Sequence, residues 1–286
     1  MPAGNLYTTP TGLLDSRNLV ADFYPRLEAA MEDLWVTRLA KIIPSDRETE
    51  EYGWLGQVPV MRRWVGGRHE EVLKKYRQTV TNYKYEVTLP ISVDDRRRDK
   101  SGQVEARIGD LALRTATHWN KIAAPYIDTA DAGTNGLAYD GQFFFDTDHN
   151  ESGTNQTNDL TATEVPSANV SDPAAVTATE AANIINETLS YMMTLTDDQG
   201  EPVNQEQGGH VVIVVTKVNH RTAFELAITL NNLNQSTDNP VNVSRRKGFT
   251  FEVVYAPGRL TAANTVKFFM GQPGSVYSAL ILQDEL

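Results

Sequence analysis

The stretch VPVMRRWVGGRHEEVLKKYRQTVTNYKYEVTLPISV, residues 58–93, decides the expected fold. In its second half, Tyr83–Val93, apolar or aromatic side chains stand at every second residue, and this period predicts a β-strand with two distinct faces. The first half, Val58–Val65, is the expected partner strand, with Gly66, Gly67 and a short charged stretch between the two. A lone two-stranded ribbon is only marginally stable in water, so we expect another surface to cover this hairpin.

Helices are predicted on both sides of the hairpin. Residues 102–128 have the clearer pattern, because apolar side chains recur there at spacings of three and four and form one stripe. The stripe consists of Ile108, Leu111, Thr115, Trp119, Ile122 and Tyr126. A helix over residues 22–43 has Pro25 near its start and ends at Pro44, and residues 1–20 are expected to form an extended arm.

The second half of the chain mixes helices and strands. One helix is predicted from Ser171 or Asp172 through Met193, with Pro173 at an early position, and a shorter one follows Asn219. The expected strands are His210–Val218, Phe249–Pro257, Thr265–Gly271 and Ser275–Gln283. The fold class predicted from these elements is α+β.

The composition removes several classes of protein. The chain has 286 residues and no cysteine, so a disulfide framework, a zinc–cysteine site and a catalytic thiol are excluded. The N-terminal residues lack the basic start and apolar core of a signal peptide, and no stretch approaches 18 apolar residues. We therefore expect a protein that is made and used in a cytoplasm, without a membrane span.

The charge of the chain is unevenly distributed. The net charge is −11, which does not favour a broad attraction to nucleic acid. Residues 62–100, however, contain eleven Lys and Arg against six Asp and Glu. A basic segment within an acidic chain is suited to contacts between copies of the same protein.

One cluster could carry chemistry. Asp146, Asp148 and His149 form a D-x-D-H sequence, and carboxylates beside an imidazole can bind a divalent metal. In an extended segment, however, the two carboxylates share one face and the histidine points to the other. A loop held by side-chain hydrogen bonds is the favoured interpretation, and the sequence contains no Walker A loop, G-x-G-x-x-G or G-x-S-x-G motif. No catalytic, cofactor-binding or metal site is predicted.

Three stretches resemble a known family. YGWLGQVPVMRRWVGGR (Tyr52–Arg68), which continues to NYKYEVTLPISVDDRRRD, and AYDGQFFFDTDH (Ala138–His149) resemble the Mu-like bacteriophage major head subunit family. DDQGEPV (Asp197–Val203) and DNPVNV (Asp238–Val243), with the β-like runs around them, are similar to a weaker pattern of tailed-phage capsid proteins in general.

This resemblance implies an HK97-type capsid fold within the α+β class. The expected parts are an N-terminal arm and helix (1–50), an extended loop or E-loop (51–93), a peripheral domain with a long spine helix (94–170), an axial domain (171–262), and C-terminal strands that return to the peripheral domain (263–286).

The resemblance also implies a function. The expected protein is the major capsid protein of a tailed bacteriophage, which assembles as hexamers and pentamers into an icosahedral shell around double-stranded DNA without reading its sequence. It is expected in the virion after assembly in the bacterial cytoplasm, with scaffold, portal and decoration proteins as further partners. Aromatic and arginine side chains dominate the energetics of interfaces, so the residues expected at contacts between subunits are Trp54, Arg62, Arg63, Trp64, Arg68, Arg96, Arg97 and Arg98.

Two alternatives remain at the level of the sequence. An encapsulin-like compartment has the same fold and encloses enzymes instead of DNA. A metal-dependent enzyme would use Asp146, Asp148 and His149.

Overall fold

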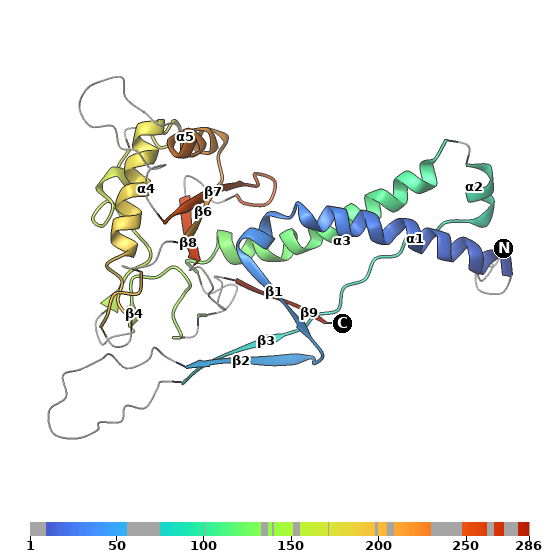
Figure 1. The fold of residues 1–286 in the computed structure, drawn as a ribbon, viewed down its shortest axis with the longest axis horizontal. Helices are drawn as coiled ribbons and strands as arrows, with labels where there is room; N and C mark the ends of the chain where they lie inside the picture. The colour runs from blue at the N-terminus through green and yellow to red at the C-terminus, as the bar shows by residue number, and fades with distance from the viewer. Residues whose placement is uncertain are drawn as a thin grey trace. The chain divides into compact units, whose positions relative to one another are not determined.

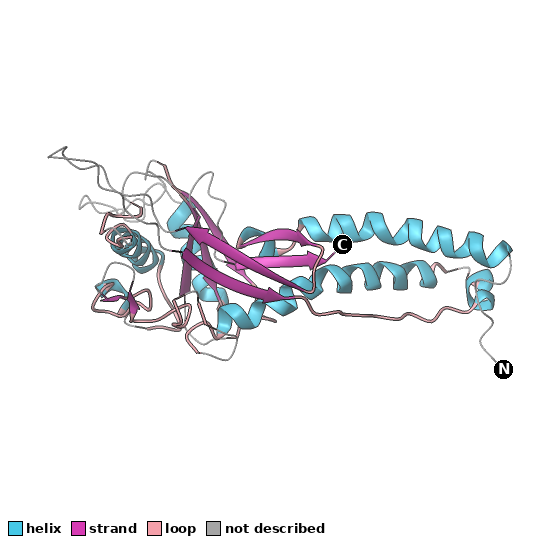
Figure 2. Cartoon of the chain, turned by 90° about the horizontal axis from the view of Figure 1, so that it is seen from below, coloured by secondary structure: helices cyan, strands magenta, loops and turns pink. Residues whose placement is uncertain are grey.

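The computed structural model divides into two compact units, Met1–Arg38 with Tyr83–Ala123 and Leu39–Asn82 with Ala124–Leu286. Each unit is described by itself, and Figures 1 and 2 show the elements of both. The structure describes residues 10–55, 75–99, 101–132, 137–138, 140–150, 155–170, 172–197, 200–204, 209–229, 248–261, 266–271 and 280–285.

A pair of long helices forms the first unit. Helix α1 (Pro10–Glu32) lies beside α3 (Gln103–Asp128) and runs in the same direction (Figures 1 and 2). An ion pair of 2.6 Å joins Arg26 of α1 to Glu105 of α3. Shorter elements flank the pair, namely the 3-10 helix η1 (Trp35–Arg38) and the helix α2 (Val93–Arg98).

Helix α3 confirms the predicted span of 102–128 almost to the residue, but its buried face differs from the predicted stripe. Within the first unit the buried positions are Ile108, Ala112, Ala116, Asn120 and Ala123. The predicted Leu111, Thr115, Trp119 and Ile122 are only partly buried, and Tyr126 is exposed. Side-chain size explains the error, because alanines let another element approach the helix closely and hydrophobicity alone does not reveal them.

The helix predicted over residues 22–43 is wrong at both ends. Helix α1 already begins at Pro10, so residues 10–20 are not an extended arm, and Pro25 lies in the interior of the helix. The chain then enters strand β1 (Ala40–Ser45), which contains Pro44 and pairs in parallel with β9 (Leu280–Glu285). A partner more than 200 residues away overrides the local helical pattern, and proline is tolerated because β1 pairs with one strand among the described residues.

The second unit contains a three-stranded sheet, in the order β7-β6-β8, with its helices. Strand β6 (His210–Val215) is parallel to β7 (Thr250–Tyr255) and antiparallel to β8 (Val266–Gly271). These strands confirm the predictions for residues 210–218, 249–257 and 265–271, with slightly shorter bounds. The smaller elements of the unit are β4 (His149–Asn150), β5 (Asn155–Gln156) and the 3-10 helix η3 (Pro166–Ala168).

The main core lies where helices α4 (Ala178–Met192) and α5 (Val218–Thr229) pack against β6. All five residues of Val211–Val215 are buried, which requires that both faces of this central strand are covered. The buried core consists of Ala181, Ala182, Ile185, Leu189, Val211, Ile213, Val215, Ala223, Phe224 and Ala227.

Helix α4 begins later than the predicted Ser171 or Asp172. Thr177 is its N-cap: the side chain accepts a hydrogen bond from the Glu180 amide, and the Glu180 carboxylate accepts one from the Thr177 amide. This capping box satisfies backbone donors that would otherwise have no partner at the helix start. Pro173 therefore lies in the preceding loop and does not open the helix.

A hairpin is present in this region, but its strands are not the predicted ones. Strand β2 (Thr49–Leu55) pairs antiparallel with β3 (Lys75–Thr81), in a register that places Trp54 opposite Tyr76. Val58–Val65 lies outside the described residues. Tyr83–Val93 is not a strand: residues 83–92 have no regular secondary structure and pair with no described strand, and Val93 begins α2. Their alternation is real, but a strand also requires a neighbour, which a single sequence does not identify.

Candidate assembly surfaces

The base of the β2–β3 ribbon is fixed by a polar cluster around the buried side chain of Ser45. The Asn82 side chain donates to Ser45 Oγ at 3.3 Å and to the Arg47 carbonyl at 2.7 Å. Ser45 Oγ in turn donates to a Glu50 carboxylate oxygen at 3.1 Å. These bonds join the two ends of the hairpin, so the direction in which the ribbon leaves the unit is defined.

A further contact joins the ribbon to the last described strand. The Tyr52 hydroxyl donates to Gln283 Oε1 of β9 at 3.0 Å. Partial burial raises the pKa of the Tyr52 phenol, and the negative charge of Glu50 raises it further, though by less. The hydroxyl therefore remains a hydrogen-bond donor throughout the physiological pH range.

The rest of the ribbon is poorly covered. Glu51, Gly53, Arg77, Thr79 and Thr81 are exposed. Tyr52, Gln78 and Val80 are partly buried. An exposed ion pair of 3.1 Å links Arg77 to Glu51 across the strands, and pairs of this kind contribute little to stability. The described ribbon is therefore a projection whose own contacts are weak.

The predicted contact residues have different outcomes. Trp54 lies in β2, within the ribbon. Arg62, Arg63, Trp64 and Arg68 lie outside the described residues.

The second predicted group consists of Arg96, Arg97 and Arg98, which are the last three residues of α2. Arg97 and Arg98 are exposed, and neither makes an ion pair with another residue that the structure describes. Asp94 and Asp95 precede them in the first turn of the same helix. The two arginines thus present positive charge at the surface of the first unit, and the role of all eight predicted residues in contacts between subunits stays a prediction.

The segment Tyr83–Leu89 presents an apolar surface. The sequence pattern placed this segment in the hairpin, but in the structure it belongs to the first unit. Tyr83, Tyr85 and Val87 are 75%, 60% and 62% exposed, and Leu89 is also exposed. Tyr85 touches α3 through its ring, which lies edge-on to His118 with 4.5 Å between the ring centroids. Alternation in the sequence located these side chains, but only the structure shows that they remain uncovered.

The D-x-D-H cluster is occupied by hydrogen bonds within its own loop. His149 Nδ1 lies 2.6 Å from Asp140 Oδ2 in a largely buried pair, and Asp148 accepts from the Asn155 side chain at 3.3 Å. Asp146 accepts from the amides of Phe143 and Thr147 at 3.2 and 2.7 Å.

The electrostatics of Asp146 agree with a structural role. Desolvation opposes its ionisation, but the surrounding amides and His149 outweigh this and lower the pKa of the carboxyl. The three side chains of the cluster face separate partners. In the part of the chain that the structure describes, no group of three or more His, Asp or Glu side chains is arranged to hold a metal ion.

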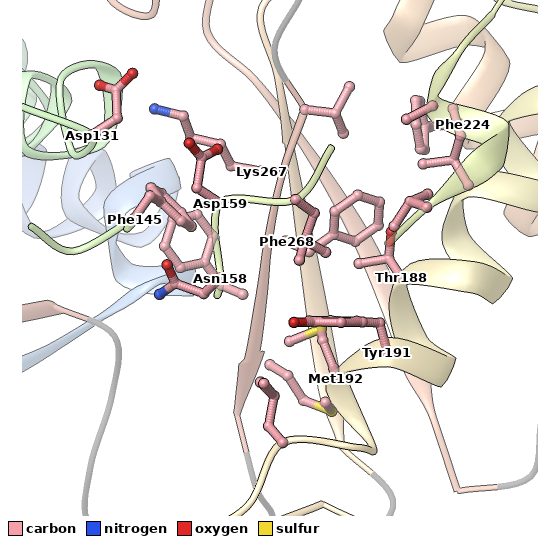
Figure 3. A pocket seen from close by; sticks show the side chains of 18 of the residues that line it. Asp131, Phe145, Asn158, Asp159, Thr188, Tyr191, Met192, Phe224, Lys267 and Phe268 are labelled. Carbon is pink, nitrogen blue, oxygen red and sulfur yellow. The ribbon is translucent and has the colours of Figure 1, made fainter. Parts of the chain in front are cut away.

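The second unit also contains a partly open apolar pocket of about 710 Å³ between α4, β8 and the loop that carries Phe144 and Phe145. Figure 3 shows Phe145, Asn158 and Lys267 on one side of it, with Phe268 and Tyr191 on the other. Most of the other lining residues are also apolar, among them Leu160, Val165, Met192, Leu195, Val203 and Met270.

Three polar side chains of this pocket bond to backbone carbonyls. Lys267 donates to the carbonyls of Ile127 and Asp128 at the end of α3, and burial lowers its pKa against the opposing effect of nearby aspartates. The Asn158 amide donates to the Phe144 carbonyl at 2.7 Å, and the Tyr191 hydroxyl donates to the Thr157 carbonyl at 3.1 Å. These bonds organise the loop, and they do not bring a nucleophile and a base together.

None of the described helices has the length and apolar character needed to cross a bilayer.

Comparison with known proteins identifies the family. Residues 18–178, more than half of the chain, match the family model of the Mu-like prophage major head subunit gpT. The chain belongs to this family. The matched region includes most of α1, the β2–β3 ribbon and α3, so it covers the surfaces described above, whereas most of the α4–β6–α5 core lies beyond it.

Two curated relatives support membership of the Mu-like head subunit family. The Mu-like prophage FluMu major head subunit of Haemophilus influenzae is 30% identical over 124 residues, which are 42% of this chain and 39% of that protein. The major capsid protein of Escherichia phage Mu is 28% identical over 128 residues, 45% of this chain and 40% of that protein. The matches thus span about two fifths of the length of these relatives.

Solved structures show the fold. The capsid of bacteriophage JBD30 superposes with a TM-score of 0.59 and 18% identity, over 78% of this chain and 90% of that chain. The procapsid of the same phage gives a TM-score of 0.53 and 18% identity, over 87% of this chain and 99% of that chain. The expected α+β fold of HK97 type is confirmed.

Proposed function

We propose that this chain is the major capsid protein of a tailed bacteriophage and that its copies assemble as hexamers and pentamers into an icosahedral shell around double-stranded DNA. The observation that carries the proposal is the family match over residues 18–178, which includes the poorly covered ribbon and most of the two-helix unit. A shell subunit needs surfaces that are incomplete in isolation, and these two regions have that property.

The function is then mechanical. The β2–β3 ribbon lies on a neighbouring subunit, and burial there supplies the contacts that the ribbon lacks in its own chain. Trp54 and Trp64 anchor it, while Arg62, Arg63 and Arg68 form ion pairs with acidic surfaces of the neighbour. Each contact is weak, but repetition over a closed shell makes the assembly strong.

Arg96, Arg97 and Arg98 form a second contact of this kind. Arg97 and Arg98 are exposed at the end of a short helix, where they can reach carboxylates of another copy. The chain as a whole is acidic, with a net charge of −11, so it has no broad attraction to DNA. The shell therefore encloses packaged DNA without sequence-specific binding.

The domains and partners follow from the same proposal. The N-terminal arm and helix (1–50), E-loop (51–93), peripheral domain (94–170), axial domain (171–262) and C-terminal strands (263–286) are the functional divisions of the subunit. Scaffold, portal and decoration proteins are its further partners, and the protein resides in the virion. It is not an enzyme, and the bonds that occupy Asp146, Asp148 and His149 support this part of the proposal.

The test is the assembly state of the purified chain. Negative-stain microscopy is expected to show closed icosahedral particles, and light scattering is expected to show growth with concentration. A compact monomer at every concentration would refute the proposal. Mass spectrometry of the particles separates the encapsulin-like alternative, since enzyme cargo enclosed in the shell would support that alternative instead.

The ribbon has its own test. Replacing residues 56–74 by Asn-Gly keeps β2 and β3 as a short hairpin and removes the distal part. The variant is expected to remain folded, as measured by circular dichroism, and to form no shells. Normal particles from this variant would contradict the role of the ribbon.

A further inference from the structure

The segment Tyr83–Leu89 has the properties of an unpaired edge strand. Its residues follow an open path without helical turns (Figure 1), all of them are exposed, and its backbone makes no hydrogen bond to another described residue. An extended strand with free amides and carbonyls is a template for pairing with another strand. The ring contact between Tyr85 and His118 fixes the segment against α3 and leaves the backbone accessible.

The unit that contains this segment has an unusual share of uncovered apolar side chains. Of the thirteen large hydrophobic residues that are exposed in the described structure, seven belong to the first unit and four of these lie in Tyr83–Leu89. The buried positions of α3 in the same unit are mostly alanine, so the helix pair itself supplies little apolar area. The segment is thus the part of this unit that gains most from a partner.

The order of residues in the segment is complementary to itself. In an antiparallel pair of two copies centred on Tyr85, Lys84 of each copy stands opposite Glu86 of the other, and Tyr83 stands opposite Val87. Opposite charges and an aromatic beside a β-branched side chain are both favourable cross-strand pairs. A two-fold contact requires this kind of symmetry, because the same surface serves both partners.

We propose that a second copy of this chain pairs antiparallel with Tyr83–Val87 about a two-fold axis at Tyr85. The contact joins the first units of two subunits through backbone hydrogen bonds, and the two Lys84–Glu86 pairs fix its register. The inference rests on the proposed function, since it describes one contact of the same shell.

A single cysteine tests the geometry, because the chain has none of its own. Residues directly opposite in an antiparallel pair have Cα atoms about 4.5–5.5 Å apart, within the range of roughly 4.4–6.8 Å that a disulfide allows. Under mild oxidation, assembled Tyr85→Cys chains are therefore expected to run as covalent dimers on a non-reducing gel. Val87→Cys is the matched control, since two copies of residue 87 are too far apart in this register and should remain monomeric.

The Tyr85→Cys variant loses the ring contact with His118, so a second variant that keeps Tyr85 is needed. The double variant Tyr83→Cys/Val87→Cys places cysteines opposite each other between copies, whereas the two positions in one strand are about 13 Å apart and cannot join. Covalent dimers are expected here as well. Shells without cross-links in both Tyr85→Cys and the double variant would overturn the inference.

Charge reversal tests the register independently. Lys84→Glu creates two like-charge pairs for each contact and is expected to weaken the pairing roughly tenfold, measured as the yield of shells. Adding Glu86→Lys in the same chain restores both pairs with opposite sign, so the double variant should recover the yield. Failure of this rescue would contradict the two-fold register. If the unmodified chain forms no particles at all, the proposed function fails and the inference fails with it, whereas shells with negative cross-linking and rescue results refute the inference alone.

Discussion

The α4–β6–α5 core and the segment Tyr83–Leu89 handle apolar side chains in opposite ways. In the core, all five residues Val211–Val215 of the central strand are buried, and Phe224 of α5 has no exposed surface. In the segment, three consecutive apolar positions are more than half exposed. The first region completes its burial within one chain, and the second remains exposed in the described structure.

This difference separates folding from assembly within one molecule. A subunit of a shell must fold before it associates, so at least one region must be stable without neighbours. It must also carry surface that becomes favourable only in the assembly. The sheet with its helices meets the first requirement, and the ribbon and the Tyr83–Leu89 segment fit the second. The comparison predicts that substitutions in the two regions change different measurements.

Phe224→Ala is expected to have the largest effect. Removing this fully buried ring should lower the free energy of unfolding by about 3–5 kcal/mol, since it removes apolar contacts and leaves a cavity. Chemical denaturation of the unassembled chain measures the change. The control Leu226→Ala lies on the same helix but is 42% exposed, and should cost less than about 0.5 kcal/mol. Equal effects of the two variants would contradict the assignment of this core.

Asn120→Ala should have an intermediate effect within the first unit. The side-chain carbonyl oxygen of Asn120 accepts the Val36 amide of η1 at 3.2 Å, and both residues are buried. Leaving a buried amide without an acceptor costs about 1–3 kcal/mol. The loss should appear in thermal melts monitored by circular dichroism, while exposed Lys121→Ala should leave the melting temperature unchanged.

Asp146→Asn should have a smaller effect that depends on pH. The folded chain lowers the pKa of this carboxyl below its ordinary 3.8, so the ionised form stabilises the fold above that value and the contribution disappears as the pH falls through the folded pKa. The unfolding free energy of the unmodified chain should therefore decrease below about pH 4, and the variant should show a flatter decrease. Asp148→Asn, which removes an exposed carboxylate that accepts a bond from the Asn155 side chain, is the control for the loss of a carboxylate in the same loop.

Val87→Ser should have the smallest effect on the isolated subunit. The side chain is 62% exposed, so its replacement is expected to change the free energy of unfolding by no more than about 0.5 kcal/mol. Shell yield should nevertheless decrease, because the apolar cross-strand pair with Tyr83 of the neighbour is lost. A variant that unfolds readily would show that Val87 supports its own unit, which would remove the contrast with the core.

Elements with strong local signals could be predicted from the sequence. Helix α3 has five turns of consistent apolar spacing, and β6 is a short apolar run of β-branched residues, so both appear close to their expected positions. The capping box at Thr177 was also visible as a Thr-x-x-Glu pattern and would have corrected the start of α4. The prediction from Ser171 or Asp172, with Pro173 at an early position, starts the helix too soon because it does not use this pattern.

Other elements depend on distant partners. Strand β1 resembled the end of a helix because its neighbour β9 begins 240 residues further along the chain. In the same way, the register of the ribbon places Trp54 opposite Tyr76, whereas alternation alone favoured Tyr83–Val93 as a strand. For the candidate contact residues, the sequence indicates which residue types and which segments to consider. That Arg97 and Arg98 are exposed is known only from the folded structure.

The sequence by itself determined the α+β class, the long helix after the hairpin, the absence of cysteine chemistry and the resemblance to a head subunit family, because these depend on residue type and local period. Only the tertiary structure decided which apolar residues are buried and which remain exposed, since burial depends on which segments meet in space. Tyr83–Leu89 and Val211–Val215 both contain β-favouring residues, and the difference between a core strand and an open edge lies in their neighbours.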